Sequence, residues 1–94
     1  MLTQESKKVI IMKKAQAGSV ESNDVLITVS ESDTLEINIT SIVSAFFYDQ
    51  IYMVIKSTLQ ELNIDKIKVD AVDKGALDYT IKARLITAIE RMEN

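Results

Sequence analysis

The chain has 94 residues, of which 47% are hydrophobic and 27% charged, and it contains neither cysteine nor histidine. Disulfides, thiolate catalysis and a Ser–His–Asp triad are therefore excluded, and the commonest zinc ligand is missing. The net charge of −3 argues against nucleic-acid binding, because phosphate contacts need a basic surface. No apolar run is long enough to span a membrane, and the first residues lack the basic–apolar–small order of a signal peptide, so we expect one cytoplasmic domain over residues 1–94.

The first half of the chain is expected to hold strands. Residues 1–7 are polar and should be loosely held, whereas residues 8–14 are rich in β-branched side chains and favour a strand. Residues 15–24, AQAGSVESND, have the composition of a polar connection. Residues 25–30 and 35–40 each alternate apolar and polar side chains on either side of a short polar turn, which predicts a β-hairpin.

From Ser41 onward the apolar period changes from two to between three and four. Ile51 and Ile55 belong to the apolar stripe of a helix of about twenty residues. Thr40 or Ser41 can cap its start, and Asn63 can end it. Aromatic side chains widen the apolar face, which indicates burial against a sheet or contact with another subunit. These aromatic residues are Phe46, Phe47, Tyr48 and Tyr52.

The last third of the chain is harder to assign. Residues 66–72 alternate again and predict a half-buried strand, and Gly75 suits the turn that follows. Residues 77–92 fit both a strand and a helix, and we expect a strand over 77–82 followed by a helix over 83–92. The predicted fold class is α+β: an antiparallel sheet of about five strands with one long and one short helix packed on one face.

Candidate catalytic groups are sparse. The 14 acidic residues are scattered as on a solvated surface. Asp70 and Asp73 could share a metal ion or a proton, but two acids beside a turn are the simpler interpretation. Lys74 beside Gly75 lacks the glycine-rich run of a phosphate-binding loop. An autonomous enzyme is therefore not expected.

Ser22 has the features of a modification site. It lies between Glu21 and Asn23 in a polar segment, so its hydroxyl should be exposed and within reach of a transferase. From composition alone, a turn serine that bonds to nearby backbone remains the simpler interpretation.

Two segments together resemble a known family. AGSVESND, residues 17–24, is similar to the A-G-T/S-x-E-S-x-D segment of the acyl carrier protein (gamma) subunit of citrate lyase. DKGALDYTIKAR, residues 73–84, is similar to the D-K-G-A-L-x-x-x-I-x-A-R signature of the same family. The two segments lie in the expected order, and the similarity covers residues 15–92.

The resemblance implies a carrier without catalytic side chains of its own. By its position in the motif, Ser22 would bear 2′-(5″-phosphoribosyl)-3′-dephospho-CoA through a phosphodiester bond, and the thiol of this group would hold acetyl or citryl as a thioester. The implied partners are the transferase and lyase subunits of citrate lyase, which cleave citrate to acetate and oxaloacetate, and the transferase that attaches the group. Neither nucleic acid nor a membrane is an implied partner.

Alternatives to this interpretation stay open. Malonate decarboxylase has a carrier subunit with the same kind of group, although ESND and DKGALD fit citrate lyase better. A non-catalytic interaction domain, using the aromatic helix face, is another alternative. An ordinary fatty-acid carrier is not expected, because the chain lacks its D-S-L site and all-α periodicity.

The surroundings of Ser22 suggest two further roles. Backbone N–H groups near Gly18 could orient the anionic phosphates of the attached group. We also hypothesise that the enzyme that attaches the group recognises Glu21 and Asp24.

Overall fold

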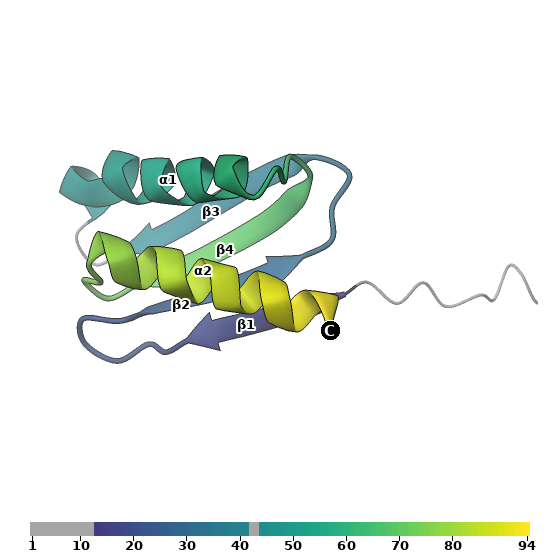
Figure 1. Ribbon diagram of the computed structural model, residues 1–94. Coiled ribbons are helices and arrows are strands. Elements are labelled where there is room, and N and C mark those ends of the chain that lie inside the picture. Colours follow the sequence, from purple (N-terminus) through teal and green to yellow (C-terminus); the bar gives the residue numbers. More distant parts are fainter. Residues whose placement is uncertain (1–12, 42–43) are drawn as a thin grey trace, which may run out of the picture.

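The fold is a single four-stranded sheet with both helices on one of its faces (Figure 1). The computed structural model describes residues 13–41 and 44–94. The elements, in chain order, are β1 (Lys14–Gly18), β2 (Val25–Ser30), β3 (Leu35–Ser41), α1 (Ser44–Glu61), β4 (Ile67–Asp73) and α2 (Asp78–Glu93). The expectation for residues 1–7, and most of the strand predicted over 8–14, lie outside the described residues.

The sheet is mixed rather than antiparallel. Its strand order is β1-β2-β4-β3, in which β1 and β4 run antiparallel to β2 whereas β3 runs parallel to β4. Parallel neighbours need a crossover connection, and α1 supplies it between β3 and β4. The α+β class is confirmed, but the prediction of about five antiparallel strands is wrong: the described part of the chain contains four strands.

The hairpin predicted for residues 25–30 and 35–40 is also wrong, although both strands exist. β4 inserts between them, pairing with β2 on one side and with β3 on the other. The burial of the strands explains this order. In β2, Val25, Ile27 and Val29 are fully buried, as suits a central strand, whereas β3 alternates between half-buried and exposed residues, as suits an edge.

Residues 77–82 form the start of a helix, not a strand. The residues that favoured a strand are exposed, with 59% of Leu77 and 73% of Tyr79 accessible. The residues at helical spacing are buried: Ile81, Leu85, Ala88 and Ile89. The single helix α2 therefore has 16 residues and replaces both the predicted strand and the predicted short helix.

The segment expected to be a polar connection starts with a strand. β1 spans Lys14–Gly18 and pairs with β2 over its whole length. α2 packs across β1 and β2, and Arg91 Nη1 donates to the Gln16 carbonyl at 2.9 Å. The small side chain of Ala17, buried beneath α2, permits this close approach. In AQAG, therefore, the small size of Ala17 suits the strand to its place beneath α2, rather than a run of large hydrophobic residues.

Helix α1 starts later than predicted and ends where predicted. Ser41 still belongs to β3, so neither Thr40 nor Ser41 caps the helix, which begins at Ser44. Asn63 takes a φ of +59°, and Ile64 N donates to the Leu59 carbonyl at 2.9 Å. This is the Schellman arrangement, and it confirms Asn63 as the helix stop.

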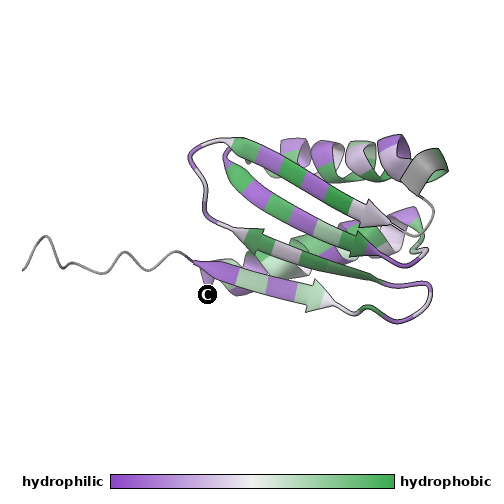
Figure 2. Cartoon of the chain, turned by 180° about the vertical axis from the view of Figure 1, so that it is seen from behind, coloured by the Kyte–Doolittle hydropathy of each residue, from purple (hydrophilic) through white to green (hydrophobic). Residues whose placement is uncertain are grey.

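The core lies between the helices and one face of the sheet. It consists of Ala17, Val25, Ile27, Val29, Ile51, Ile55, Leu59, Ile67, Val69, Ala71, Ile81, Leu85, Ala88 and Ile89. Figure 2 shows the sheet from the other side, which neither α1 nor α2 covers; hydrophilic and hydrophobic residues alternate along β3 and β4, whereas β2 is hydrophobic over most of its length. None of the helices described here is long and apolar enough to cross a membrane.

One end of the molecule gathers most of the connections. The β1–β2 loop, the carboxyl ends of β3 and β4, and the first turns of both helices all lie there (Figure 1). The motif at residues 17–24 and the start of the motif at residues 73–84 therefore meet at the same end.

Candidate functional site

Ser22 lies at the tip of a tight turn in the β1–β2 loop. Asp24 N donates to the Glu21 carbonyl at 3.1 Å, which makes Ser22 and Asn23 the two central residues. Asn23 has a φ of +66°, a conformation that asparagine tolerates at the third position of such turns. Ser22 is exposed, and no described residue hydrogen bonds to its hydroxyl. The turn therefore presents this hydroxyl to solvent.

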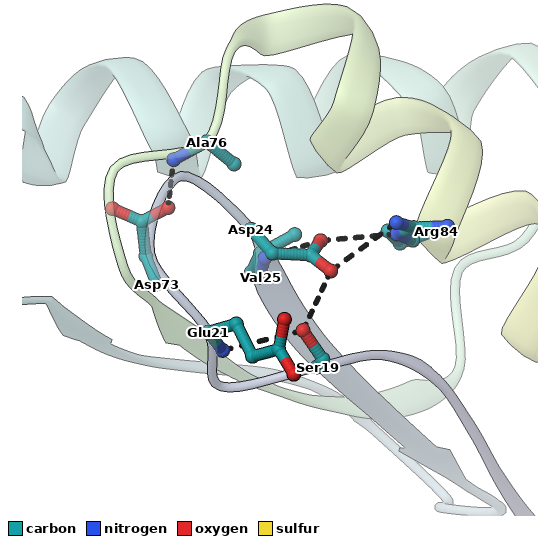
Figure 3. Close-up of polar contacts among 7 residues, drawn as sticks. All are labelled: Ser19, Glu21, Asp24, Val25, Asp73, Ala76 and Arg84. Atoms are coloured by element: carbon teal, nitrogen blue, oxygen red, sulfur yellow. Dashed lines mark hydrogen bonds and ion pairs between the residues drawn. The ribbon is translucent and has the colours of Figure 1, made fainter.

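The Asp24 carboxylate faces into the protein and fixes the loop (Figure 3). It accepts hydrogen bonds from Arg84 Nε at 3.1 Å and Arg84 Nη2 at 3.2 Å, from Ser19 Oγ at 2.8 Å and from Val25 N at 2.7 Å. These bonds, with that from Arg84 first, lower the pKa of Asp24 from 3.8 to about 2. Asp24 is therefore charged and engaged at neutral pH.

The backbone of the turn is also tied to the segment after β4. Asn23 N donates to the Lys74 carbonyl and Lys74 N donates to the Asp24 carbonyl, both at 2.8 Å. The two motifs thus touch through backbone as well as through the ion pair. Lys74 contributes these backbone bonds, not the phosphate-loop role considered from the sequence.

Asp73 holds the segment on which the turn rests. Its side chain is buried, with 2% of the residue exposed. One carboxylate oxygen accepts from Ala76 N at 3.0 Å and the other accepts from Ser41 Oγ at 2.9 Å. Asp73 therefore ties the ends of β3 and β4 to the turn that leads into α2.

Position 18 must be a glycine because there is no room there for a side chain. It has a φ of +96°, and a Cβ atom there would lie 1.8 Å from the Val25 carbonyl oxygen. The same Cβ would lie 3.3 Å from Arg84 Cδ. A glycine at this position lets the chain turn out of β1 directly beneath the arginine that holds Asp24.

Other residues singled out in the sequence have different outcomes. Asp70 accepts from Asn38 Nδ2 at 3.0 Å on the uncovered face of the sheet, whereas Asp73 is buried at the end of the strand, and each has partners of its own. The described residues contain no group of three that could hold a metal ion. Near Gly18, Ser19 N donates to Val25 O and Glu21 N to Ser19 Oγ, so these N–H groups are already used.

The aromatic face of α1 is more exposed than predicted. Phe46 is 88% exposed and Phe47 is 50% exposed, while Tyr48 stacks on Tyr52 with ring centroids 6.4 Å apart. Phe47 also lines an apolar groove of about 630 Å³. The other residues along it include Ile51, Gly75, Leu77, Tyr79 and Ile81. The groove therefore runs from the turn after β4 along both helix starts.

Comparison with known proteins decides the family. A family model of the malonate decarboxylase delta subunit, an acyl carrier protein, matches residues 12–92. The citrate lyase acyl carrier protein of Oenococcus oeni is 51% identical over 85 residues, which cover 89% of this chain and 88% of the relative. That of Latilactobacillus sakei is 51% identical over 78 residues, covering 82% and 77%. The chain belongs to the citrate lyase acyl carrier protein family.

Membership in this family makes the chain a carrier subunit rather than an enzyme, because its relatives are named as acyl carrier proteins. An acyl carrier holds its cargo on a covalently attached prosthetic group. A solved structure, that of a Pseudomonas malonate decarboxylase hetero-tetramer in complex with malonate, contains a chain that matches with a TM-score of 0.56. The identity is 18%, and the match covers 84% of this chain and 82% of that one. It shows that the fold is shared.

Sequence reasoning did not assign three residues of this site their contacts, although it considered Asp73 with Asp70 as a pair that could share a metal ion or a proton. Ser19, Asp73 and Arg84 all lie inside the two motifs, but nothing in their local sequence indicates a contact between the motifs. The joint presence of both motifs was the one available signal.

Proposed function

We propose that the chain is the acyl carrier subunit of citrate lyase and that Ser22 bears the prosthetic group. The main support is the difference between the two serine hydroxyls of the loop. The hydroxyl of Ser19 is engaged with Asp24, whereas that of Ser22 is exposed and unbonded among the described residues. A modifying enzyme needs an accessible hydroxyl whose reaction breaks no internal bond. Ser22 meets this need and Ser19 does not.

The charges around Ser22 fit an anionic group. The sequence places two acids, Glu21 and Asp24, beside the serine, and both would repel a phosphodiester. In the structure the positive charge of Arg84 compensates the negative charge of Asp24. The charge of Glu21 is not compensated in this way, but Glu21 is exposed, so solvent screens its repulsion. The residues present therefore tolerate the phosphates of 2′-(5″-phosphoribosyl)-3′-dephospho-CoA.

Attachment through a phosphodiester requires an activated donor, which we infer to be a phosphoric anhydride of the group. The Ser22 hydroxyl passes its proton to a base on the attaching enzyme as its oxygen forms a bond to the phosphorus. The anhydride P–O bond breaks, and the leaving phosphate departs with the bonding electron pair. The chain itself supplies the nucleophilic oxygen and the turn that presents it.

Once bound, the group would supply a terminal thiol that holds an acyl chain as a thioester. The chain's own part is to anchor the group at a fixed point and to leave its surroundings open. The proposed partners are the transferase and lyase subunits of citrate lyase, between which the tethered acyl group moves without release. Cleavage of citrate to acetate and oxaloacetate takes place on those subunits.

A carrier subunit of malonate decarboxylase is the second candidate. The matching family model and the solved structure favour it. Identity weighs against it: the citrate lyase relatives share 48–51% with this chain, and the malonate decarboxylase structure 18%. Reconstitution with each set of catalytic subunits separates the two, because only the cognate set should turn over its substrate.

Intact-mass measurement of the chain, co-expressed with its attaching enzymes, tests the site. We expect a mass increase equal to the phosphoribosyl-dephospho-CoA group, lost completely in Ser22→Ala. Ser19→Ala is the matched control, since it removes the other hydroxyl of the loop and should keep the full mass shift at the end of the reaction. An unmodified wild-type chain, or a group mapped to Ser19, would contradict the proposal.

A further inference from the structure

We propose that Arg84 and Asp24 are a positioning pair, which holds the Ser22 turn in the shape that attachment requires. The inference is an alternative to the hypothesis that the attaching enzyme recognises Asp24. It rests on the proposed function of Ser22 and assigns a role to the end of the second motif.

The first support is that the Asp24 carboxylate has no acceptor capacity left. Each carboxylate oxygen has two lone pairs in the plane of the group. Oδ1 accepts from Arg84 Nε and Val25 N, and Oδ2 accepts from Arg84 Nη2 and Ser19 Oγ. The Asp24 side chain is also 17% exposed. An approaching enzyme would have to break an internal bond in order to read this carboxylate.

The second support is that the same residue closes the turn around Ser22. Asp24 N donates to the Glu21 carbonyl across the turn, and the Asp24 carbonyl accepts from Lys74 N. Fixing the side chain of Asp24 therefore fixes the backbone on the C-terminal side of Ser22. The hydroxyl of Ser22 remains free while its backbone does not.

The third support is the element that carries Arg84. It lies within α2, between the buried residues Ile81 and Leu85, which pack into the core. Its guanidinium makes a two-pronged contact with Asp24, a geometry that lysine cannot reproduce. The position of the turn is thus set by a helix that is itself fixed by the core.

Position matters for the reaction proposed at Ser22. An oxygen that attacks phosphorus must approach in line with the leaving group, and displacement by about 1 Å can cost roughly 100-fold in rate. Release of the turn should therefore slow attachment by about 10- to 100-fold without removing any group that touches the donor. A direct role of Arg84 on the donor phosphates is the competing explanation, since its side chain is 42% exposed.

The first measurement needs no attaching enzyme. Backbone amide exchange of the peptide that spans residues 19–24 is followed by mass spectrometry in full-length wild type, Arg84→Gln and Asp24→Asn. We expect roughly tenfold faster exchange in both variants. Lys82→Gln is the matched control, because Lys82 lies on the same helix and pairs with Glu61 away from the loop. Unchanged exchange in Arg84→Gln would overturn the proposed pair.

The second measurement is the rate of attachment with the enzyme and an anhydride donor. Arg84→Gln and Asp24→Asn should each be slowed about 10- to 100-fold, and the double variant should be no slower than the slower single one. Arg84→Lys should be modified faster than Arg84→Gln but more slowly than wild type. The control Lys82→Gln should be modified at the wild-type rate.

Three results of the rate measurement would also overturn the inference. Asp24→Asn modified at the wild-type rate beside a slow Arg84→Gln would show that Arg84 acts on the donor. Rate losses that multiply in the double variant would show two independent contacts with the enzyme. Arg84→Gln modified at the wild-type rate would remove the positioning role. A wild-type chain that is never modified at Ser22 would instead refute the proposed function. The amide-exchange measurement would still test whether Arg84 and Asp24 hold the turn.

Discussion

Replacing Gly18 by alanine should destabilise the fold far more than replacing Gly75 by alanine. The two glycines have nearly the same backbone conformation, with φ values of +96° and +97°. Both substitutions therefore carry a left-handed strain of about 1–2 kcal/mol. They differ in space, because the new Cβ would lie 1.8 Å from the Val25 carbonyl oxygen at Gly18 but 3.6 Å from its nearest atom, Asn23 Oδ1, at Gly75.

The clash at Gly18 cannot be relieved by rotating a side chain, because the opposing atom is backbone. The chain leaving β1 has to move away from Val25, which breaks the bond from Ser19 N to the Val25 carbonyl and disturbs the pairing of Gly18 with Leu26. Two lost backbone hydrogen bonds cost about 2 kcal/mol together. We therefore expect a loss of about 3–4 kcal/mol for Gly18→Ala against about 1–2 kcal/mol for Gly75→Ala.

Urea unfolding followed by circular dichroism measures both variants under the same conditions, with the slopes compared to confirm two-state behaviour. A domain of this size has roughly 5–14 kcal/mol in total, so the difference is within range. If the free energies of unfolding of Gly18→Ala and Gly75→Ala agree within about 0.5 kcal/mol, the argument from space is refuted.

Two further predictions concern buried or engaged carboxylates. Because the pKa of Asp24 is lowered from 3.8 to about 2, its charged form stabilises the fold above pH 4, and this contribution is lost as the pH falls from about 4 to 2. The pKa shift is equivalent to about 2 kcal/mol of stability, which solvent screening at the exposed Arg84 reduces to about 1 kcal/mol. The free energy of unfolding, measured as a function of pH, should show this loss in wild type but not in Asp24→Asn. In urea unfolding, Asp73→Ala should lower the free energy of unfolding by about 2–3 kcal/mol, because it leaves the Ala76 N–H without its acceptor. Asp73→Asn retains an acceptor oxygen and should lower it by about 1 kcal/mol. Equal losses in the two variants would contradict this prediction.

The sequence predicted where strands and helices lie better than how they pair. The alternation in residues 25–30 and 35–40 correctly indicated two strands, since period two reports which side chains face the core. Pairing depends on residues far away in the chain: β4 arrives only after α1 and inserts between them. A short polar turn therefore looked like a hairpin connection when it joins two strands that are not neighbours.

Residues 77–82 show a second limit. Leu77, Tyr79 and Ile81 alternate as in a strand, but Ile81 also starts the helical stripe that continues through Leu85 and Ala88. Local pattern could not separate these periods. Burial does, since Tyr79 is exposed beside the groove while Ile81 is fully buried.

At the site, the sequence located the exposed serine but did not indicate the contacts that its neighbours make. Ser22 followed from polarity and from the motif, both of which are local. Asp24 was hypothesised to be recognised by the attaching enzyme, and the structure places it in contact with Arg84, 60 positions along the chain. An ion pair over that separation has no local signature, and only the packing of α2 over β1 brings its partners together.

The layout of the molecule has a practical consequence for immobilisation and labelling. The C-terminus, Asn94, lies at the end of α2, opposite the end at which the β1–β2 loop and the starts of both helices lie (Figure 1). Lys14, where β1 begins, is paired with Ser30 at that same opposite end. A surface linker or fluorescent tag joined to Asn94 would therefore leave Ser22 facing away from the support, and single tethered molecules could be watched while their cargo is exchanged.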